Sequence, residues 1–244
     1  MRIRHHNDEG PGQAGMAAAQ PGAPGSGTEA GQAAPPAFVT RRRLGLWMGG
    51  GAALLVSRAA RAGFPPGSAI DGVLPDLAFH MTRTSDGKPV TAADYRGKIV
   101  VLYFGFTRCT DTCPLTMSNM ALVMGRMGPL AARMRVLFVT VDLGYDTVPR
   151  LKTFLARFGT PPQIDGLYGT PAELAALAHR CDVSYAAPSG PNSPDPVSRI
   201  RHTSLVYVFG PHGRSRDLLA DLNTGKADLA AIAEGFEAMA RAIA

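Results

Sequence analysis

Two cysteines four positions apart, Cys109 and Cys113, carry the clearest chemistry of this 244-residue chain. They stand in GFTRCTDTCP (residues 105–114), where an apolar run of strand type gives way to a helical pattern. Free N–H groups and the positive dipole at the start of a helix stabilise thiolates, and a thiolate is both a nucleophile and a metal ligand. The pair therefore suits a structural or redox-active disulfide, or a soft metal shared by both sulfurs.

A third ligand would distinguish a metal site from a redox site, and His202 is the candidate. It precedes an apolar strand predicted over 203–209, and in a thioredoxin-like sheet this strand lies beside the one that leads into the cysteines. Cys109, Cys113 and His202 are then expected to converge on one rim of the sheet. Two sulfurs and one imidazole suit Cu(I) and also accept Cu(II). The alternative is thiol–disulfide exchange, in which Cys109 attacks and Cys113 resolves.

The elements that must position these residues follow from the hydrophobic pattern. Apolar runs predict buried strands over 98–106, 134–142 and 203–209. Helical spacing predicts helices over 114–127, 147–158, 171–180 and 226–243. Strands at 77–81 and 88–91 around an Asp-Gly turn predict a hairpin, a short strand follows at 217–220, and a proline-rich stretch over 186–200 predicts a loop. This order predicts an α/β, thioredoxin-like fold with an N-terminal hairpin and a long insertion loop.

The first 62 residues have the composition of a leader. Residues 1–39 are rich in Gly and Pro and poor in bulky apolar side chains, which predicts disorder. In residues 40–62 three arginines precede an apolar run that ends at a small-x-small sequence, and Arg41-Arg42 resembles a twin-arginine export signal. We expect this segment to be cleaved or to be retained as a single membrane anchor. Residues 63–244 would then form a thioredoxin-like copper-binding domain at the periplasmic face of the inner membrane.

Composition excludes several classes of protein. With 45% hydrophobic and 18% charged residues the chain is globular, and it has no run of 18 apolar residues that would indicate a polytopic membrane protein. Three cysteines are too few for a disulfide-dense scaffold. Most of the net charge of +6 lies in the leader, so the charge does not indicate a nucleic-acid partner.

The site motifs resemble those of the SCO/SenC copper-chaperone family. GFTRCTDTCP is similar to that family's G-F/Y-T-x-C-P-D-x-C-P signature. VTVD (139–142), followed by Asp146-Thr147, is similar to its V-S-V-D-P-x-x-D-T segment, and RHTS (201–204) resembles its D-H-S/T motif. The resemblance spans most of residues 70–243. It implies a thioredoxin-fold domain that binds one copper through Cys109, Cys113 and His202.

The same resemblance implies a role and a set of partners. The chain would be a chaperone rather than an enzyme, and it would help to build the dinuclear copper centre of cytochrome c oxidase. The copper-site subunit of the oxidase would be the recipient, and an upstream copper donor and a thiol reductant would be further partners. A membrane surface would be near, through the anchor or through the recipient.

Three positions depart from the family pattern. Thr110 replaces a proline between the cysteines, and Leu143 replaces a proline after the strand that ends in VTVD. Arg201 replaces an acidic residue before the histidine. We expect Thr110 to loosen the loop slightly, and we expect the charge of Arg201 to lower the pKa of His202 and to weaken cation binding.

Further residues have both a structural and a functional interpretation. Asp142 is either a turn residue or a group that orients the site, and Asp111 either caps the helix or adjusts the pKa of the thiolates. Cys181 is expected to be a buried thiol, and the functional alternative is a thiol that resolves a disulfide. Methionines at helical spacing are expected to be core residues rather than thioether ligands, namely Met117, Met120, Met124 and Met127.

Overall fold

The computed structural model describes residues 67–186 and 200–243. The leader predictions for residues 1–39 and 40–62 lie outside these ranges, as does most of the predicted loop over 186–200. Within the described ranges, no helix is both long enough and apolar enough to cross a membrane.

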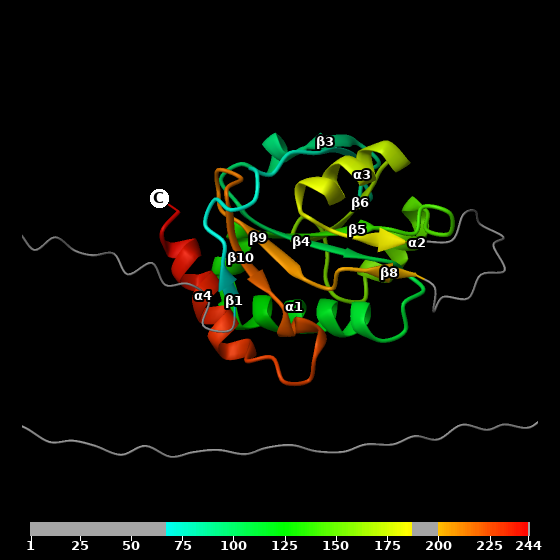
Figure 1. The fold of residues 1–244 in the computed structure, drawn as a ribbon. Coiled ribbons are helices and arrows are strands. Elements are labelled where there is room, and N and C mark those ends of the chain that lie inside the picture. The colour runs from blue at the N-terminus through cyan, green and yellow to red at the C-terminus, as the bar shows by residue number, and fades with distance from the viewer. Residues whose placement is uncertain (1–66, 187–199, 244) are drawn as a thin grey trace, which may run out of the picture. The chain divides into compact units, whose positions relative to one another are not determined.

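The strands and helices alternate through most of the described chain (Figure 1). The strands are β1 (Gly67–Ala69), β2 (His80–Arg83), β3 (Pro89–Thr91), β4 (Ile99–Gly105), β5 (Met134–Thr140), β6 (Ile164–Tyr168), β7 (Tyr185–Ala186), β8 (Arg201–His202), β9 (Val206–Phe209) and β10 (Ser215–Leu219). The α-helices are α1 (Thr112–Met127), α2 (Val148–Leu155), α3 (Pro171–Arg180) and α4 (Leu229–Arg241).

The described strands form one mixed sheet and one small ribbon. The sheet has eight strands in the order β1-β10-β9-β4-β5-β6-β2-β3, and β7 pairs with β8. β4, β5 and β6 are parallel, whereas β9 is antiparallel to β4 and β10 is antiparallel to β9. The central order β10-β9-β4-β5, with a helix after β4 and another after β10, is that of a thioredoxin-like fold and confirms the predicted class. Figure 1 shows α1 and α4 along one face of the sheet and α3 on the other.

The centre of the sheet explains the continuous apolar run that leads into the cysteines. All seven residues of β4 are buried, because helices cover both faces of the sheet. The four methionines of α1 are buried as well, with Met117 and Met120 fully inaccessible, so the prediction that they belong to the core is confirmed.

Several strands differ from the sequence prediction. β1 and β6 were not predicted, because β1 is only three residues long and β6 contains Asp165 and Gly166. The strand predicted over 203–209 is shorter in the structure and begins only at Val206, as β9. The two-residue strands β7 and β8 were not predicted; they pair with each other outside the main sheet, with Tyr185 opposite His202.

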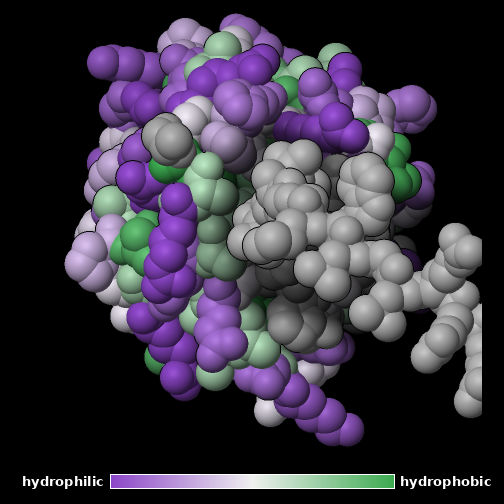
Figure 2. Space-filling view, turned by 90° about the vertical axis from the view of Figure 1, so that its left-hand side faces the viewer, coloured by the Kyte–Doolittle hydropathy of each residue, from purple (hydrophilic) through white to green (hydrophobic). Residues whose placement is uncertain are grey.

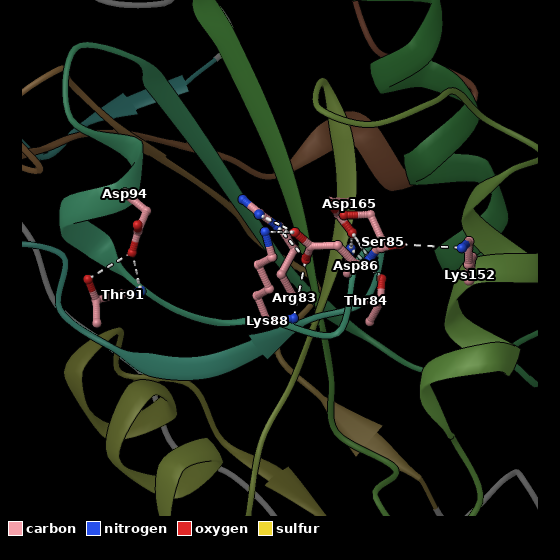
Figure 3. Close-up of polar contacts among 10 residues, drawn as sticks. Arg83, Thr84, Ser85, Asp86, Lys88, Thr91, Asp94, Lys152 and Asp165 are labelled. Atoms are coloured by element: carbon pink, nitrogen blue, oxygen red, sulfur yellow. Dashed lines mark hydrogen bonds and ion pairs between the residues drawn. The ribbon is translucent and has the colours of Figure 1, made fainter.

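The carboxylate of Asp165 in β6 receives its hydrogen bonds from the β2–β3 hairpin, whose strand β2 pairs with β6. Asp165 is buried, and its Oδ1 accepts hydrogen bonds from Thr84 Oγ1 at 3.0 Å and from the Ser85 amide at 3.1 Å. The hairpin turn is held by Arg83, which bonds Asp86 at 2.6 Å (Figure 3). A strand with a buried carboxylate is therefore stable here because residues some 80 positions earlier supply its donors.

The described surface carries scattered apolar side chains. Figure 2 shows a face on which hydrophilic side chains predominate and hydrophobic ones lie in small groups between them. Val73 and Leu122 are the exposed large hydrophobic residues of the described ranges, and they lie on different elements. Isolated residues of this kind are normal on a protein surface.

Candidate metal centre

The three predicted ligands lie in one neighbourhood at the rim of the sheet. Cys109 lies in the loop after β4, Cys113 in the first turn of α1, and His202 in β8. The sulfur of Cys113 is 3.8 Å from Nε2 of His202. The backbone N–H of Cys113 donates a hydrogen bond to the sulfur of Cys109 at 3.4 Å. Neither cysteine is part of a disulfide. Cys113 therefore contacts both of the other predicted ligands.

The chain folds this way locally because of one small residue and one long-range strand pairing. A Cβ on Gly105, the last residue of β4, would lie 2.7 Å from the ring of Phe138 and 3.0 Å from the sulfur of Cys113. The glycine thus makes room for Cys113 beneath the loop. His202 reaches Cys113 because β9, which follows it, pairs with β4.

The Cys113–His202 pair fits a shared metal. With metal–sulfur and metal–nitrogen bonds of about 2.3 and 2.0 Å, two ligands at about 120° are roughly 3.7 Å apart. The observed separation of 3.8 Å matches this value. Among the described residues, however, no three His, Cys, Asp or Glu side chains form a ready-made cluster. Two of the three predicted ligands are thus in position, and the sulfur of Cys109 lies against the first amides of α1.

The histidine presents the correct nitrogen. Nδ1 of His202 lies 3.1 Å from the backbone oxygen of Thr203, which can only accept a hydrogen bond, so Nδ1 carries the proton. Nε2 then turns a lone pair toward Cys113. The rings of Tyr103 and Phe106 pack edge-on against the imidazole, with centroids at 6.1 and 5.7 Å. The imidazole is therefore fixed in a tautomer and orientation that can bind a metal.

Burial, rather than the neighbouring arginine, controls the charge of this histidine. Desolvation lowers the pKa of His202, and the Thr203 carbonyl and Cys109 partly oppose that effect. Arg201 is exposed and is not among the causes of the shift. The expectation that Arg201 would lower this pKa was therefore wrong, because its charge lies in solvent, where water screens it.

The two cysteines differ strongly in acidity. The pKa of Cys109 is lowered to about 4, because the Cys113 thiol, the Thr112 hydroxyl and the amides of Cys113 and Asp111 all donate hydrogen bonds to its sulfur. The pKa of Cys113 is raised, because its proton is held by Cys109 and because it is buried. The hydroxyl of Tyr103 lies 3.7 Å from the Cys113 sulfur. The reduced site therefore holds one thiolate, half-exposed, and one buried thiol.

Asp111 and Asp142 have different roles from each other. Asp111 occupies the N-cap position of α1 but makes no side-chain capping bond, because its backbone lies outside the extended region that capping requires. The capping interpretation was wrong, and the backbone amide of Asp111 instead lowers the pKa of Cys109. Asp142 is fully buried and binds Nε of Arg108 at 2.7 Å. It therefore anchors the residue that precedes Cys109.

A second anchor of the cysteine loop, Asp146, was not predicted as a site residue from the sequence. Asp146 is buried and accepts hydrogen bonds from the backbone and hydroxyl of Thr107 and from the hydroxyl of Thr140. These bonds join the cysteine loop to the end of β5. The sequence feature that could have identified Asp146 is an aspartate six positions after Thr140, the last residue of a buried strand. Cys181, at the end of α3, is buried as expected, and burial raises its pKa to about 12.

Comparisons with known proteins agree on one family. The family model described as SCO1/SenC matches residues 76–237. The mitochondrial SCO1 homolog of Mus musculus is 34% identical over 154 residues, which are 62% of this chain and 52% of the relative. The Homo sapiens SCO1 homolog is 31% identical over 155 residues, 63% of this chain and 50% of that protein. The chain thus spans about half the length of these relatives.

Solved structures show the same similarity. Bradyrhizobium japonicum ScoI with copper bound has 29% identity and a TM-score of 0.56, over 66% of this chain and 96% of that one. Yeast Sco1 with copper bound has 28% identity and a TM-score of 0.55, over 66% of this chain and 88% of that one.

Proposed function

The chain belongs to the SCO1/SenC family, and from this premise we propose that it is a copper chaperone that serves the assembly of cytochrome c oxidase. Its cargo is one copper ion, held by Cys109, Cys113 and His202. The recipient is the copper-site subunit of the oxidase, and an upstream copper donor and a thiol reductant complete the set of partners. Delivery of a bound ion is ligand exchange and involves no catalytic turnover of a substrate.

The observation that carries the proposal is the contact between Cys113 and His202. The Cys113 sulfur and the unprotonated Nε2 of His202 lie 3.8 Å apart, although the two residues are 89 positions apart in the chain. Burying two polar groups in this way costs free energy, which a structural role alone would not explain. The copper bound in the similar ScoI and yeast Sco1 structures supports copper as the metal. The soft donor set supports it independently.

The asymmetry of the two sulfurs indicates how copper would leave. Cys109 is half-exposed and already a thiolate, so its sulfur is ready to bind copper without releasing a proton. Cys113 is buried and must lose its proton when copper binds. A recipient thiolate would therefore approach from the side of Cys109, replace that sulfur first, and leave Cys113 and His202 as the last ligands.

Copper stoichiometry of the reduced chain tests the ligand set. We expect one copper per wild-type chain and loss of tight binding in Cys109→Ser, Cys113→Ser and His202→Ala. His212→Ala is the matched control, because His212 lies in the turn between β9 and β10 and should leave binding unchanged.

Two results would contradict the proposal in different ways. Tight copper binding by His202→Ala would remove the histidine from the ligand set. If neither the wild-type chain nor any variant binds copper, and the Cys109–Cys113 disulfide cycles readily, the result would favour a thiol–disulfide oxidoreductase. The copper bound in the similar structures does not favour that alternative.

We propose further that the chain is exported, with its copper-binding domain at the periplasmic face of the inner membrane. The support is the sequence of residues 40–62, with three arginines before an apolar run. Changing Arg41-Arg42 to Lys-Lys should block export. Changing Arg58, which directly follows the apolar run, to Lys should leave export unchanged. Normal export of the Lys-Lys variant would contradict a twin-arginine signal.

A further inference from the structure

An open groove of about 390 Å³ lies between the cysteine loop and α2. Its lining includes Thr107, Arg108, Tyr145, Arg150, Phe154 and Arg157. Arg108 directly precedes Cys109, so this groove begins at the residue next to the more exposed of the two site sulfurs. A molecule seated in the groove would lie beside the route by which copper is proposed to leave.

The groove is built to hold positive charge in fixed positions. The guanidinium groups of Arg108 and Arg150 lie 4.7 and 4.3 Å from the centre of the Tyr145 ring. The guanidinium of Arg157 lies 5.7 Å from the ring centre of Phe154 and 5.4 Å from that of Phe158. Stacking on aromatic rings limits the freedom of these long side chains, so little further ordering is needed when they bind a partner.

Two of the three charges have no acidic partner within the described residues. Arg108 is paired with the buried Asp142. Arg150 donates to the backbone oxygen of Tyr145, and both Arg150 and Arg157 are exposed and form no ion pair in the part of the chain that the structure describes. The other acid nearby, Asp146, is buried and turned toward hydroxyl groups. Two fixed guanidinium groups beside the metal loop therefore remain available for external carboxylates.

We propose that this groove docks an acidic segment of the protein that receives copper from this chain, with Arg150 and Arg157 as its main contacts. The inference rests on the proposed copper-delivery function. Carboxylates of the partner would pair with the two guanidinium groups, while apolar atoms of the same segment would contact Tyr145 and Phe154. Docking there would bring the partner's copper ligands to the Cys109 side of the site, and charge attraction would accelerate the encounter.

Copper transfer to the soluble copper-site domain of the oxidase subunit tests the inference. We compare the wild-type chain with Arg150→Glu/Arg157→Glu, and we use Arg157→Glu alone as a second variant because Arg157 makes only ring contacts. Arg126→Glu, at the last turn of α1, is a charge-matched control away from the groove. Copper stoichiometry is measured for every variant first, because the groove does not supply a copper ligand and loading should stay at the wild-type value.

The association rate with the oxidase domain at low ionic strength should fall about tenfold or more in the double variant, and the difference should shrink as salt is added. Arg126→Glu should keep the wild-type rate. If the double variant associates and transfers copper as fast as the wild-type chain, the docking role of the groove is wrong, and the proposed function is unaffected. Failure of the wild-type chain to transfer copper at all would overturn both. Perturbation of the arginine Nε–H NMR signals by inorganic phosphate but not by the oxidase domain would identify a simple anion site and also overturn the proposal.

Discussion

Replacing Cys113 with alanine should raise the pKa of Cys109 from about 4 toward its ordinary value of 9. The hydrogen bond from the Cys113 thiol is the largest cause of the low value, and alanine removes it. Serine at the same position keeps a donor, so Cys113→Ser should keep the pKa of Cys109 closer to the wild-type value. The two variants therefore separate the effect of the donated proton from the effect of changing the side chain.

The pH dependence of alkylation reports this pKa directly. At pH 6 a thiol with a pKa of about 4 is roughly 99% ionised, whereas one with a pKa above 7 is less than about 10% ionised. The wild-type rate should therefore be flat between pH 6 and 8, and the rate of the alanine variant should rise about tenfold per pH unit until its own pKa is reached. A rise of three pKa units also makes the thiolate roughly twentyfold more nucleophilic, so the shape of the profile, and not the rate at one pH, is the quantity to compare.

The assay follows iodoacetamide modification of Cys109 in the reduced, metal-free chain by peptide mass spectrometry. Cys113 should react far more slowly, since it is buried and its pKa is raised. Cys181→Ser is the control and should leave the profile of Cys109 unchanged. A wild-type rate that climbs steadily to pH 9, or an alanine variant with the wild-type profile, would refute the assignment of the hydrogen-bond donor.

Three further substitutions have distinct expected results. Arg108→Ala leaves the buried carboxylate of Asp142 without its partner and should cost about 3–5 kcal/mol, or roughly 10 °C in Tm by calorimetry. An unchanged Tm would show that the pair does not stabilise the loop. Gly105→Ala places a methyl group 3.0 Å from the Cys113 sulfur. It should lower copper affinity and cost about 1–3 kcal/mol in urea denaturation, and wild-type values for both would contradict the close approach. Met120→Leu conserves volume in the core, so it should cost less than about 1.5 kcal/mol and leave copper stoichiometry unchanged, whereas loss of copper would make this methionine a ligand.

Local pattern in the sequence determined most of the elements that carry the site. The apolar run before the cysteines became β4, buried on both faces, and the helical spacing after them became α1 with its buried methionines. These features are predictable because periodicity and burial depend on residues close together in the chain. The same reasoning failed at β6, where Asp165 interrupts the pattern and is satisfied only by distant residues of the hairpin.

The sequence also predicted that the two cysteines lie at a strand–helix junction, and that position predicts a thiolate. Which cysteine is the thiolate was decided by tertiary structure, because the proton of Cys113 is shared with Cys109 only in the folded loop. The sequence likewise proposed His202 as a ligand but contained no information about which nitrogen faces the sulfur. The carbonyl of Thr203 determines that choice.

The groove charges and the loop anchors were decided by the tertiary structure alone. Arg108 meets Asp142 across 34 positions, and His202 meets Cys113 across 89, at the places where β5 and β9 flank β4. Sequence spacing identifies residues suited to this chemistry, since side-chain type and local helix or strand formation are encoded nearby. Distances, protonation states and ion pairs depend on which strands become neighbours, and that follows only from packing of the whole sheet.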